Sequence, residues 1–132
     1  MADRISFDLV SPERLLLSED AEMVTLPGTE GDLGVLAGHE PLITTLRPGI
    51  IDVKGGGNGE ERFFVLGGFA DINPGKLTVL AEEAFPLASI NAGLVDQRIA
   101  NIREDLIGAK TDHERHRLAS ALDALETLRG AL

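Results

Sequence analysis

Hydrophobic and polar residues alternate with a period of two in the first two thirds of the chain. Ile5, Phe7 and Leu9 alternate with the polar residues between them, and this pattern predicts a strand with one buried face. Gly, Pro and Asn residues separate the further strand candidates, which are residues 50–54, 62–66 and 77–81. Many short strands at this spacing favour a β-sandwich or a flattened barrel.

The sequence predicts two tight turns between these strands. Residues 55–59, Gly-Gly-Gly-Asn-Gly, are typical of a flexible hairpin tip. Residues 73–76, Asn-Pro-Gly-Lys, predict a turn in which Pro74 sets its own φ and Gly75 is free to take a positive φ. No helical pattern follows the glycine run, as a phosphate-binding loop would require, so both segments are interpreted as connections between strands.

The apolar residues of the last third follow a helical period instead. Their spacing of three or four positions predicts two helices, each with one apolar face. The first stripe consists of Val95, Ile99, Ile102 and Leu106, and the second consists of Leu118, Leu122, Leu125 and Leu132.

Local signals indicate where these helices end and begin. Gly108 is placed to end the first helix. Thr111 and Glu114 match a capping box, in which the Thr111 oxygen accepts from the backbone N–H of Glu114 and the Glu114 side chain returns to the N–H of Thr111. The sequence therefore predicts a helical hairpin that turns between Gly108 and Thr111.

The composition of the chain changes near residue 86. All 6 prolines and all 5 phenylalanines lie at or before Pro86, together with 12 of the 15 glycines. The first 86 residues carry 6 basic and 15 acidic residues, whereas the remainder carries 6 and 7. We therefore expect two domains, a β-sandwich domain at residues 1–86 and a helical hairpin domain at residues 87–132.

The overall charge and the cysteine count narrow the range of functions. The formal net charge of -10 repels phosphate backbones and anionic lipid, so we expect no nucleic-acid partner and no insertion into lipid. The chain has no cysteine, which excludes disulfides and thiolate metal sites. No apolar run approaches the roughly 20 residues that span a bilayer, and the first ten residues lack the features of a signal sequence. We expect a soluble protein that is not exported.

We expect no catalytic residue, metal or cofactor in this chain. The 3 histidines match no zinc-binding signature. The carboxylate pair Glu82 and Glu83 has no cysteine, tyrosine or tryptophan to act with it, and no Gly-x-Ser-x-Gly elbow is present. A solvated or partner-facing surface is therefore a better interpretation of these carboxylates than catalysis.

Several stretches of the chain occur in an order that resembles one known family. They are Val10-Ser11-Pro12, residues 26–44 (LPGTEGDLGVLAGHEPLIT), residues 46–49 (LRPG), residues 63–72 (FFVLGGFADI) and residues 77–84 (LTVLAEEA). Followed by a charged helical hairpin, this order resembles the epsilon subunit of the F-type ATP synthase, from about residue 4 to the C-terminus. The resemblance implies an N-terminal ten-stranded β-sandwich and a C-terminal antiparallel two-helix hairpin.

The resemblance also implies a function. Members of this family are non-catalytic subunits of the central stalk, which couples the c ring to the gamma subunit during proton-driven ATP synthesis. One end of the sandwich meets the c ring and one face packs on the gamma subunit. The interface residues implied here are Glu30, Gly31, Asp32, His39, Pro41 and Leu42. An acidic loop of this kind can steer docking onto basic groups in the polar loops of a membrane ring.

For the hairpin, the resemblance implies contact with the alpha and beta subunits of the catalytic head and a brake on ATP hydrolysis, as in some relatives. Two short aliphatic helices bury little surface, which is compatible with a hairpin that moves. The location implied is peripheral, at the cytoplasmic face of a bacterial inner membrane, because the sequence shows no transit peptide.

Some relatives bind ATP on the hairpin through an Asp-x-x-Arg-Ala pattern and two arginines on the second helix. Here Arg98 follows Asp96 one position early, which rotates it by about 100° around a helix. Matching the second helix to the family puts Ser120 and Ala124 where the arginines belong. Asp96 and Arg98 are therefore weak candidates for a nucleotide site.

Two functions of other classes remain open. A stand-alone ligand-binding β-sandwich protein would need an apolar pocket with convergent polar groups. A small hydrolase would need turnover by a carboxylate pair such as Glu82 and Glu83, for which the sequence offers no accompanying nucleophile.

Overall fold

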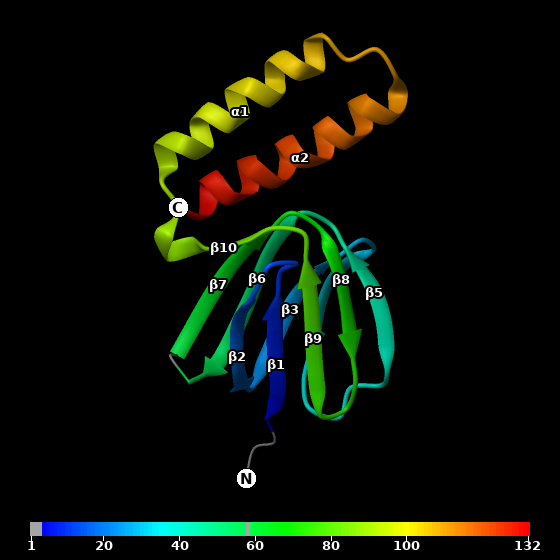
Figure 1. The fold of residues 1–132 in the computed structure, drawn as a ribbon, viewed down its shortest axis with the longest axis vertical. Coiled ribbons are helices and arrows are strands. Elements are labelled where there is room, and N and C mark those ends of the chain that lie inside the picture. The colour runs from blue at the N-terminus through cyan, green and yellow to red at the C-terminus, as the bar shows by residue number, and fades with distance from the viewer. Residues whose placement is uncertain (1–3, 58) are drawn as a thin grey trace. The chain divides into compact units, whose positions relative to one another are not determined.

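The structure, a computed structural model, describes residues 4–57 and 59–132. Figure 1 shows a curled β-sheet followed in the chain by two helices. The chain divides into two compact units, residues 1–87 and residues 88–132.

Ten strands form one continuous hydrogen-bonded sheet in the first unit. The strands are β1 (Ile5–Val10), β2 (Leu15–Ala21), β3 (Met23–Gly28), β4 (Gly31–Val35), β5 (Leu42–Leu46), β6 (Gly49–Gly56), β7 (Gly59–Val65), β8 (Gly68–Ile72), β9 (Lys76–Ala81) and β10 (Ala84–Pro86). Their order in the sheet is β10-β7-β6-β3-β5-β8-β9-β1-β2, and β4 pairs with β3. The pair β1 and β9 is parallel and the other pairs are antiparallel. The ten-stranded β-sandwich that the family resemblance implies is confirmed.

The core of this unit is made by side chains on alternate positions of the strands. Ile5, Phe7 and Leu9 of β1 are completely buried, as their alternation predicts. Burying a side chain of this size stabilises the fold by about 1.5–3 kcal/mol. No polar or charged residue is classed as buried in the part of the chain that the structure describes. The inner face of the sheet therefore holds together by apolar packing.

The predicted turns fall between strands. Gly56 pairs with Gly59 across the tip of the β6–β7 hairpin, whereas Asn58 lies outside the described residues. In the turn between β8 and β9, the backbone N–H of Asn73 donates to Lys76 over 2.9 Å and that of Lys76 returns to Asn73 over 3.3 Å. Gly75 does not adopt a positive φ, so the expectation that the turn uses this freedom is wrong.

The second unit is a helical hairpin, as predicted. It contains α1 (Ala92–Ile107) and α2 (Asp112–Ala131), preceded by the short 3-10 helix η1 (Leu87–Ser89). The Asn91 side chain caps α1 by accepting from the N–H groups of Gly93 and Leu94, at 2.8 and 3.3 Å. Gly108 ends α1 at φ -87, so the helix ends where predicted without a left-handed residue.

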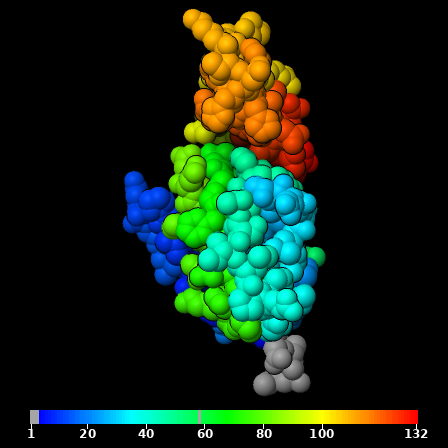
Figure 2. Space-filling view, turned by 90° about the vertical axis from the view of Figure 1, so that its right-hand side faces the viewer, coloured from blue at the N-terminus to red at the C-terminus, as the bar shows by residue number. Residues whose placement is uncertain are grey.

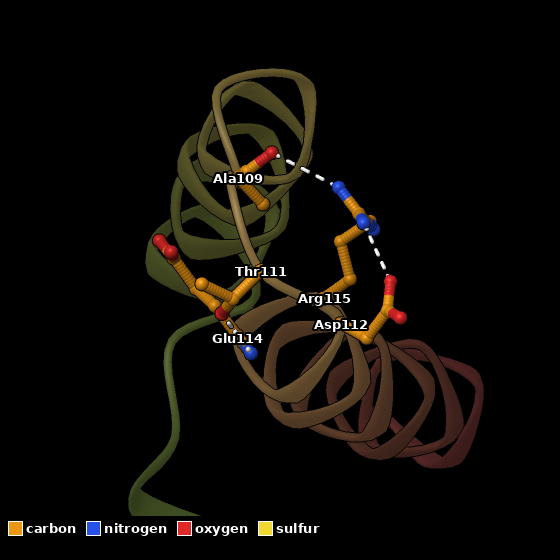
Figure 3. A network of polar contacts seen from close by, with 5 residues as sticks. All are labelled: Ala109, Thr111, Asp112, Glu114 and Arg115. Atoms are coloured by element: carbon orange, nitrogen blue, oxygen red, sulfur yellow. Dashed lines mark hydrogen bonds and ion pairs between the residues drawn. The ribbon is translucent and has the colours of Figure 1, made fainter.

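The capping box at the start of α2 is only half formed. Figure 3 shows the Thr111 oxygen accepting from the backbone N–H of Glu114 over 3.1 Å. In the described part of the hairpin, Glu114 does not make the predicted return bond. Arg115 instead closes the turn, because its guanidinium donates to the Ala109 carbonyl over 3.1 Å and to the Asp112 carboxylate over 2.6 Å.

The apolar faces of the two helices pack on each other. The buried side chains are Val95, Ile99, Leu118, Ala124, Leu125 and Leu128. Leu132 is 42% exposed and follows the last helical residue, so its predicted place in the buried stripe is wrong. Leu128 occupies that place because it lies three positions after Leu125, on the same face of α2.

Hydrogen bonds connect β2 and its link to β3 with the end of β6. The backbone N–H of Glu22 donates to the Lys54 carbonyl of β6 over 2.9 Å. Nearby, the Glu19 carboxylate of β2 accepts from the Gly57 N–H over 3.1 Å through Oε2. The first bond continues the pairing of β3 with β6 by one residue, and the second joins β2 to the turn that follows β6.

The second oxygen of Glu19, Oε1, is buried and has no hydrogen-bond partner in the described structure. Burial raises the pKa of the Glu19 carboxyl, the Glu61 carboxylate adds to this effect, and the bond from the Gly57 N–H opposes it. Folding therefore favours the protonated form of Glu19.

We expect Gly68→Ala to destabilise the first unit by about 3 kcal/mol or more. Gly68 has φ +135, and a Cβ there would lie 2.1 Å from the Leu80 carbonyl oxygen and 2.9 Å from the Ala81 Cα. Both obstacles are backbone atoms of the paired strand β9, so they cannot move aside cheaply. Urea denaturation would measure the loss.

Gly75→Ala is the matched control for this prediction. A Cβ at Gly75 meets nothing within 4 Å, and its φ is not positive. We expect this variant to stay within about 0.5 kcal/mol of the wild type. Equal stability of the Gly68→Ala and Gly75→Ala variants would contradict the prediction.

We expect Glu19→Gln to reduce the dependence of stability on pH. Because folding raises the pKa of Glu19, its contribution is fully present below the ordinary glutamate value of 4.5 and is lost as pH rises through the folded pKa. Glutamine stays neutral and keeps an oxygen acceptor for Gly57. Between about pH 4 and about pH 7, the free energy of unfolding of Glu19→Gln should fall less than that of the wild type. Exposed Glu60→Gln serves as control, and identical pH profiles for wild type and Glu19→Gln would argue against this account.

Candidate partner-binding surfaces

The structure divides the six predicted interface residues between two ends of the sandwich. Glu30, Gly31 and Asp32 lie where β3 turns into β4, and His39, Pro41 and Leu42 lie where β4 leads to β5. The strand β5 connects the two ends, because its last residue Leu46 pairs with Gly28 and its first residue Leu42 pairs with Ile72. Five strand residues separate the two groups by about 13 Å along the strand. Each group of three is brought together, but the two groups are not.

The first end is a tight turn, which we call the 28–32 loop (residues 28–32). Gly28 pairs with Gly31, so that Thr29 and Glu30 form a two-residue connection. Gly31 has φ +130, and a Cβ on Gly28 would lie 2.7 Å from the Gly31 carbonyl oxygen. The glycines are therefore needed for the path of the backbone in this loop.

Polar contacts tie the 28–32 loop to the end of β5. The N–H of Thr29 donates to the Thr45 carbonyl over 3.2 Å, and the hydroxyls of these two residues are 3.2 Å apart. Arg47 donates from its guanidinium to the Asp32 carboxylate over 2.6 Å and to the Gly28 carbonyl. Sequence reasoning did not identify Arg47, although the Arg-Pro-Gly sequence directly after a strand marks a turn.

The opposite end of β5 combines apolar groups with one imidazole and one exposed carboxylate, that of Glu40. The N–H of Gly38 donates to the Pro74 carbonyl over 2.7 Å, and Gly38 has φ +87. The N–H of His39 donates to the Leu36 carbonyl over 3.2 Å, and its ring Nδ1 lies 2.7 Å from the Glu40 carbonyl oxygen. Leu36 is 54% exposed. This end is therefore less charged than the 28–32 loop.

A third surface, which the sequence analysis did not identify, lies on the outside of β5, β8 and β9. We call it the outer apolar face, and it consists of Ile43, Thr45, Phe69 and Leu80. Thr45 pairs with Phe69 and Phe69 pairs with Leu80, so their side chains lie beside one another on one side of the sheet. Ile43 is 71% exposed. Figure 2 looks onto the side of the sandwich unit on which β5 lies, coloured cyan.

The first unit has two depressions of about 250 Å³ each, one of which includes part of the outer apolar face. One is lined by Pro12, Thr45, Gly68, Phe69, Leu80, Ala81 and Glu82. The other is lined by Ser11, Pro12, Glu13, Arg14, Leu16, Glu82, Glu83, Ala84 and Phe85. Each is smaller than the roughly 300–1,000 Å³ that small-molecule pockets usually have.

On the hairpin, the structure separates Asp96 from Arg98. Asp96 accepts from Arg129 of α2 over 2.8 Å, so its carboxylate faces the second helix. Arg98 lies two positions after Asp96, so it projects about 200° around the axis of α1 from Asp96. Its side chain is exposed. Arg103 and Glu126 form a second contact between the helices, at 3.8 Å. Sequence reasoning missed Arg129 because its pairing depends on how the two helices align.

Two further features bear on metal and membrane binding. Among residues 4–57 and 59–132, no group of three or more His, Cys, Asp or Glu side chains is arranged to hold a metal ion. Within the same residues, neither helix is both long and apolar enough to cross a membrane.

Comparison with known proteins gives consistent matches. A family model described as the β-sandwich domain of the ATP synthase Delta/Epsilon chain matches residues 4–87. The ATP synthase epsilon chain of Parvibaculum lavamentivorans is 50% identical over 129 residues, covering 98% of this chain and 98% of that protein. The ATP synthase epsilon chain of Mesorhizobium japonicum is 46% identical over 132 residues, covering 100% of this chain and 98% of that protein.

Solved structures show the same fold. A chain in the cryo-EM structure of the Euglena gracilis mitochondrial ATP synthase, which contains OSCP, F1 and the c-ring, matches with a TM-score of 0.82 and 29% identity. The match covers 97% of this chain and 81% of that chain. A chain in the central stalk and c-ring structure of the Tetrahymena thermophila mitochondrial ATP synthase has a TM-score of 0.69 at 14% identity, covering 96% and 95%. The second likeness concerns the fold alone.

Proposed function

The chain belongs to the epsilon-chain family of ATP synthases, and on that premise we propose that it is a non-catalytic subunit of the central stalk. In this role it couples the c ring to the gamma subunit during proton-driven ATP synthesis. The single observation that supports this role best is the outer apolar face, where Ile43 is 71% exposed beside Phe69 and Leu80. A torque-transmitting subunit needs an extensive attachment of this kind more than it needs a pocket.

The two kinds of surface suit two kinds of partner. The outer apolar face packs against the gamma subunit, because burial of exposed aliphatic and aromatic side chains gives a stable attachment. His39, Pro41 and Leu42 adjoin this attachment at the start of β5, where Leu42 is 44% exposed although it points to the opposite side of the strand from Ile43. The 28–32 loop, with Glu30, meets polar loops of the c ring, where a carboxylate contributes to register and specificity.

The proposal assigns no chemistry and no nucleotide to the chain itself. The chain has no cysteine nucleophile and no Gly-x-Ser-x-Gly elbow. On the hairpin, Asp96 is paired with Arg129 and Arg98 points elsewhere, so the two candidate nucleotide-binding residues do not converge. ATP is therefore left out of the proposed ligands.

The proposed location follows from the proposed partners. The chain lies at the cytoplasmic face of the bacterial inner membrane, peripheral to the bilayer, and its attachment to the c ring and the gamma subunit keeps it there. The acidic surface, with a net charge of -10, disfavours direct binding to anionic lipid.

We expect a tagged chain to recover the gamma subunit, the catalytic subunits and the c ring in fixed proportion from detergent-solubilised membranes. Ile43→Lys should lower this recovery about tenfold, because the variant replaces the most exposed apolar side chain of the outer apolar face with a charged one. Leu15→Lys is the matched control, because Leu15 is also exposed but lies on β2, outside the outer apolar face. Recovery of the wild-type chain alone would overturn the rotor assignment and favour the ligand-binding alternative.

The hairpin is proposed to act as a movable brake on ATP hydrolysis through contact with the alpha and beta subunits. We expect deletion of residues 88–132 to raise ATP hydrolysis by the assembled enzyme, while the remaining sandwich unit keeps its attachment to the rotor. The measurement compares hydrolysis by enzyme reconstituted with the full-length and the shortened chain, at equal subunit proportions. Unchanged hydrolysis would argue against the brake.

A further inference from the structure

Arg47 holds the 28–32 loop from outside it. Its backbone N–H donates to the Pro27 carbonyl of β3 over 2.9 Å. Its guanidinium donates to the Gly28 carbonyl and to the Asp32 carboxylate, the latter over 2.6 Å. One residue therefore bonds to both strands that the loop connects.

These contacts contribute more to the shape of the loop than to global stability. The side chains of Arg47 and Asp32 are 44% and 67% exposed, and ion pairs at such exposed sites stabilise a fold little. A guanidinium can donate to two acceptors in a fixed planar geometry, so it constrains the positions of a carbonyl and a carboxylate at once. The ammonium group of lysine has no such planar fork.

The two acidic side chains of the loop, Asp32 and Glu30, differ in their contacts. Asp32 is paired with Arg47, and the positive charge of Arg47 offsets its negative charge. Glu30 is exposed and makes no ion pair or hydrogen bond to the rest of the described chain. The neighbouring Thr29 is fixed to Thr45 by its backbone N–H and approached by the Thr45 hydroxyl. Glu30 is thus carried on a backbone that is held on both sides.

We propose that Arg47 is a positioning residue of the partner interface, which fixes the 28–32 loop so that Glu30 contacts a basic group of the partner while Asp32 serves as the internal counter-ion. This inference rests on the proposed function, since it concerns the interface at which the chain meets the rotor. A loop already held in its bound conformation loses less conformational entropy on association, so the fixed loop binds more tightly than a free one would. The partner is a protein loop with an exposed lysine or arginine side chain.

The test measures binding of the purified full-length chain to rotor complexes of the gamma subunit and c ring from which the native subunit has been removed. We expect Arg47→Ala and Glu30→Ala each to weaken binding about tenfold, and the double variant to bind no more weakly than either single variant by more than about twofold. This non-additivity follows because Arg47 acts through Glu30. A residue with only a general structural role would give losses that multiply.

Two further variants keep the test sharp. Asp32→Asn retains an oxygen that accepts from Arg47 but loses the charge, so we expect its affinity to change by less than about threefold. Arg62→Ala is the matched control, because Arg62 is an exposed arginine on β7 of the same unit and should leave binding unchanged. If Arg47→Ala lowers the unfolding temperature more than Arg62→Ala does, Arg47→Lys replaces it in the cycle, with the same expectation of non-additivity.

Each outcome decides between the two levels of the proposal. The inference is supported if the wild type binds, the losses of affinity in the double-mutant cycle are non-additive, and Asp32→Asn keeps its affinity within about threefold. The role of Arg47 is overturned if the wild type binds and any one of three results is found: the losses of affinity are additive, Arg47→Ala binds like the wild type, or Asp32→Asn loses much affinity. Each of these results leaves the proposed function intact. Failure of the wild-type chain to bind intact rotor complexes overturns the proposed function, and the inference with it.

Discussion

The pairing register of the ten-stranded sheet is the constraint on which the rest of the first unit depends. Side chains alternate between the two faces of a strand, so a shift by one residue would exchange every inward and outward position. In β1, the register with β2 and β9 keeps Ile5, Phe7 and Leu9 inside. Because no polar residue is classed as buried in the described chain, a shifted register would bury groups that have no partners there.

The same register that buries the core also creates the surfaces. Ile43, Phe69 and Leu80 lie outside because their neighbours Thr44, Ala70 and Val79 lie on the inner side of the same strands. The interior thus accounts for most of the apolar residues of these three strands, and Ile43, Phe69 and Leu80 remain exposed on the outside. The same pairing places the acidic 28–32 loop at one end of β5 and the turn that contains His39 at the other end.

The hairpin is held together differently. Its contact rests on a narrow apolar face and on exposed charge pairs, such as Asp96 with Arg129 and Arg103 with Glu126. Exposed pairs of this kind contribute little each, and helices of this length are marginal without apolar packing. The sandwich unit is therefore held by an extensive apolar core, whereas the hairpin is held by a smaller apolar contact and by weak charge pairs.

The sequence by itself determined those elements of this protein whose signals are local. Alternation in β1, the end of α1 at Gly108 and the Thr111 cap depend on residues within one turn or one strand. Only the tertiary structure decided which distant residues meet. It separated Glu30 from His39 along β5, and it paired Asp32 with Arg47 and Asp96 with Arg129, across 15 and 33 positions of the chain. Spacing along the chain carries no record of such pairs, since they arise from strand register and helix alignment, which the packing of the whole unit sets.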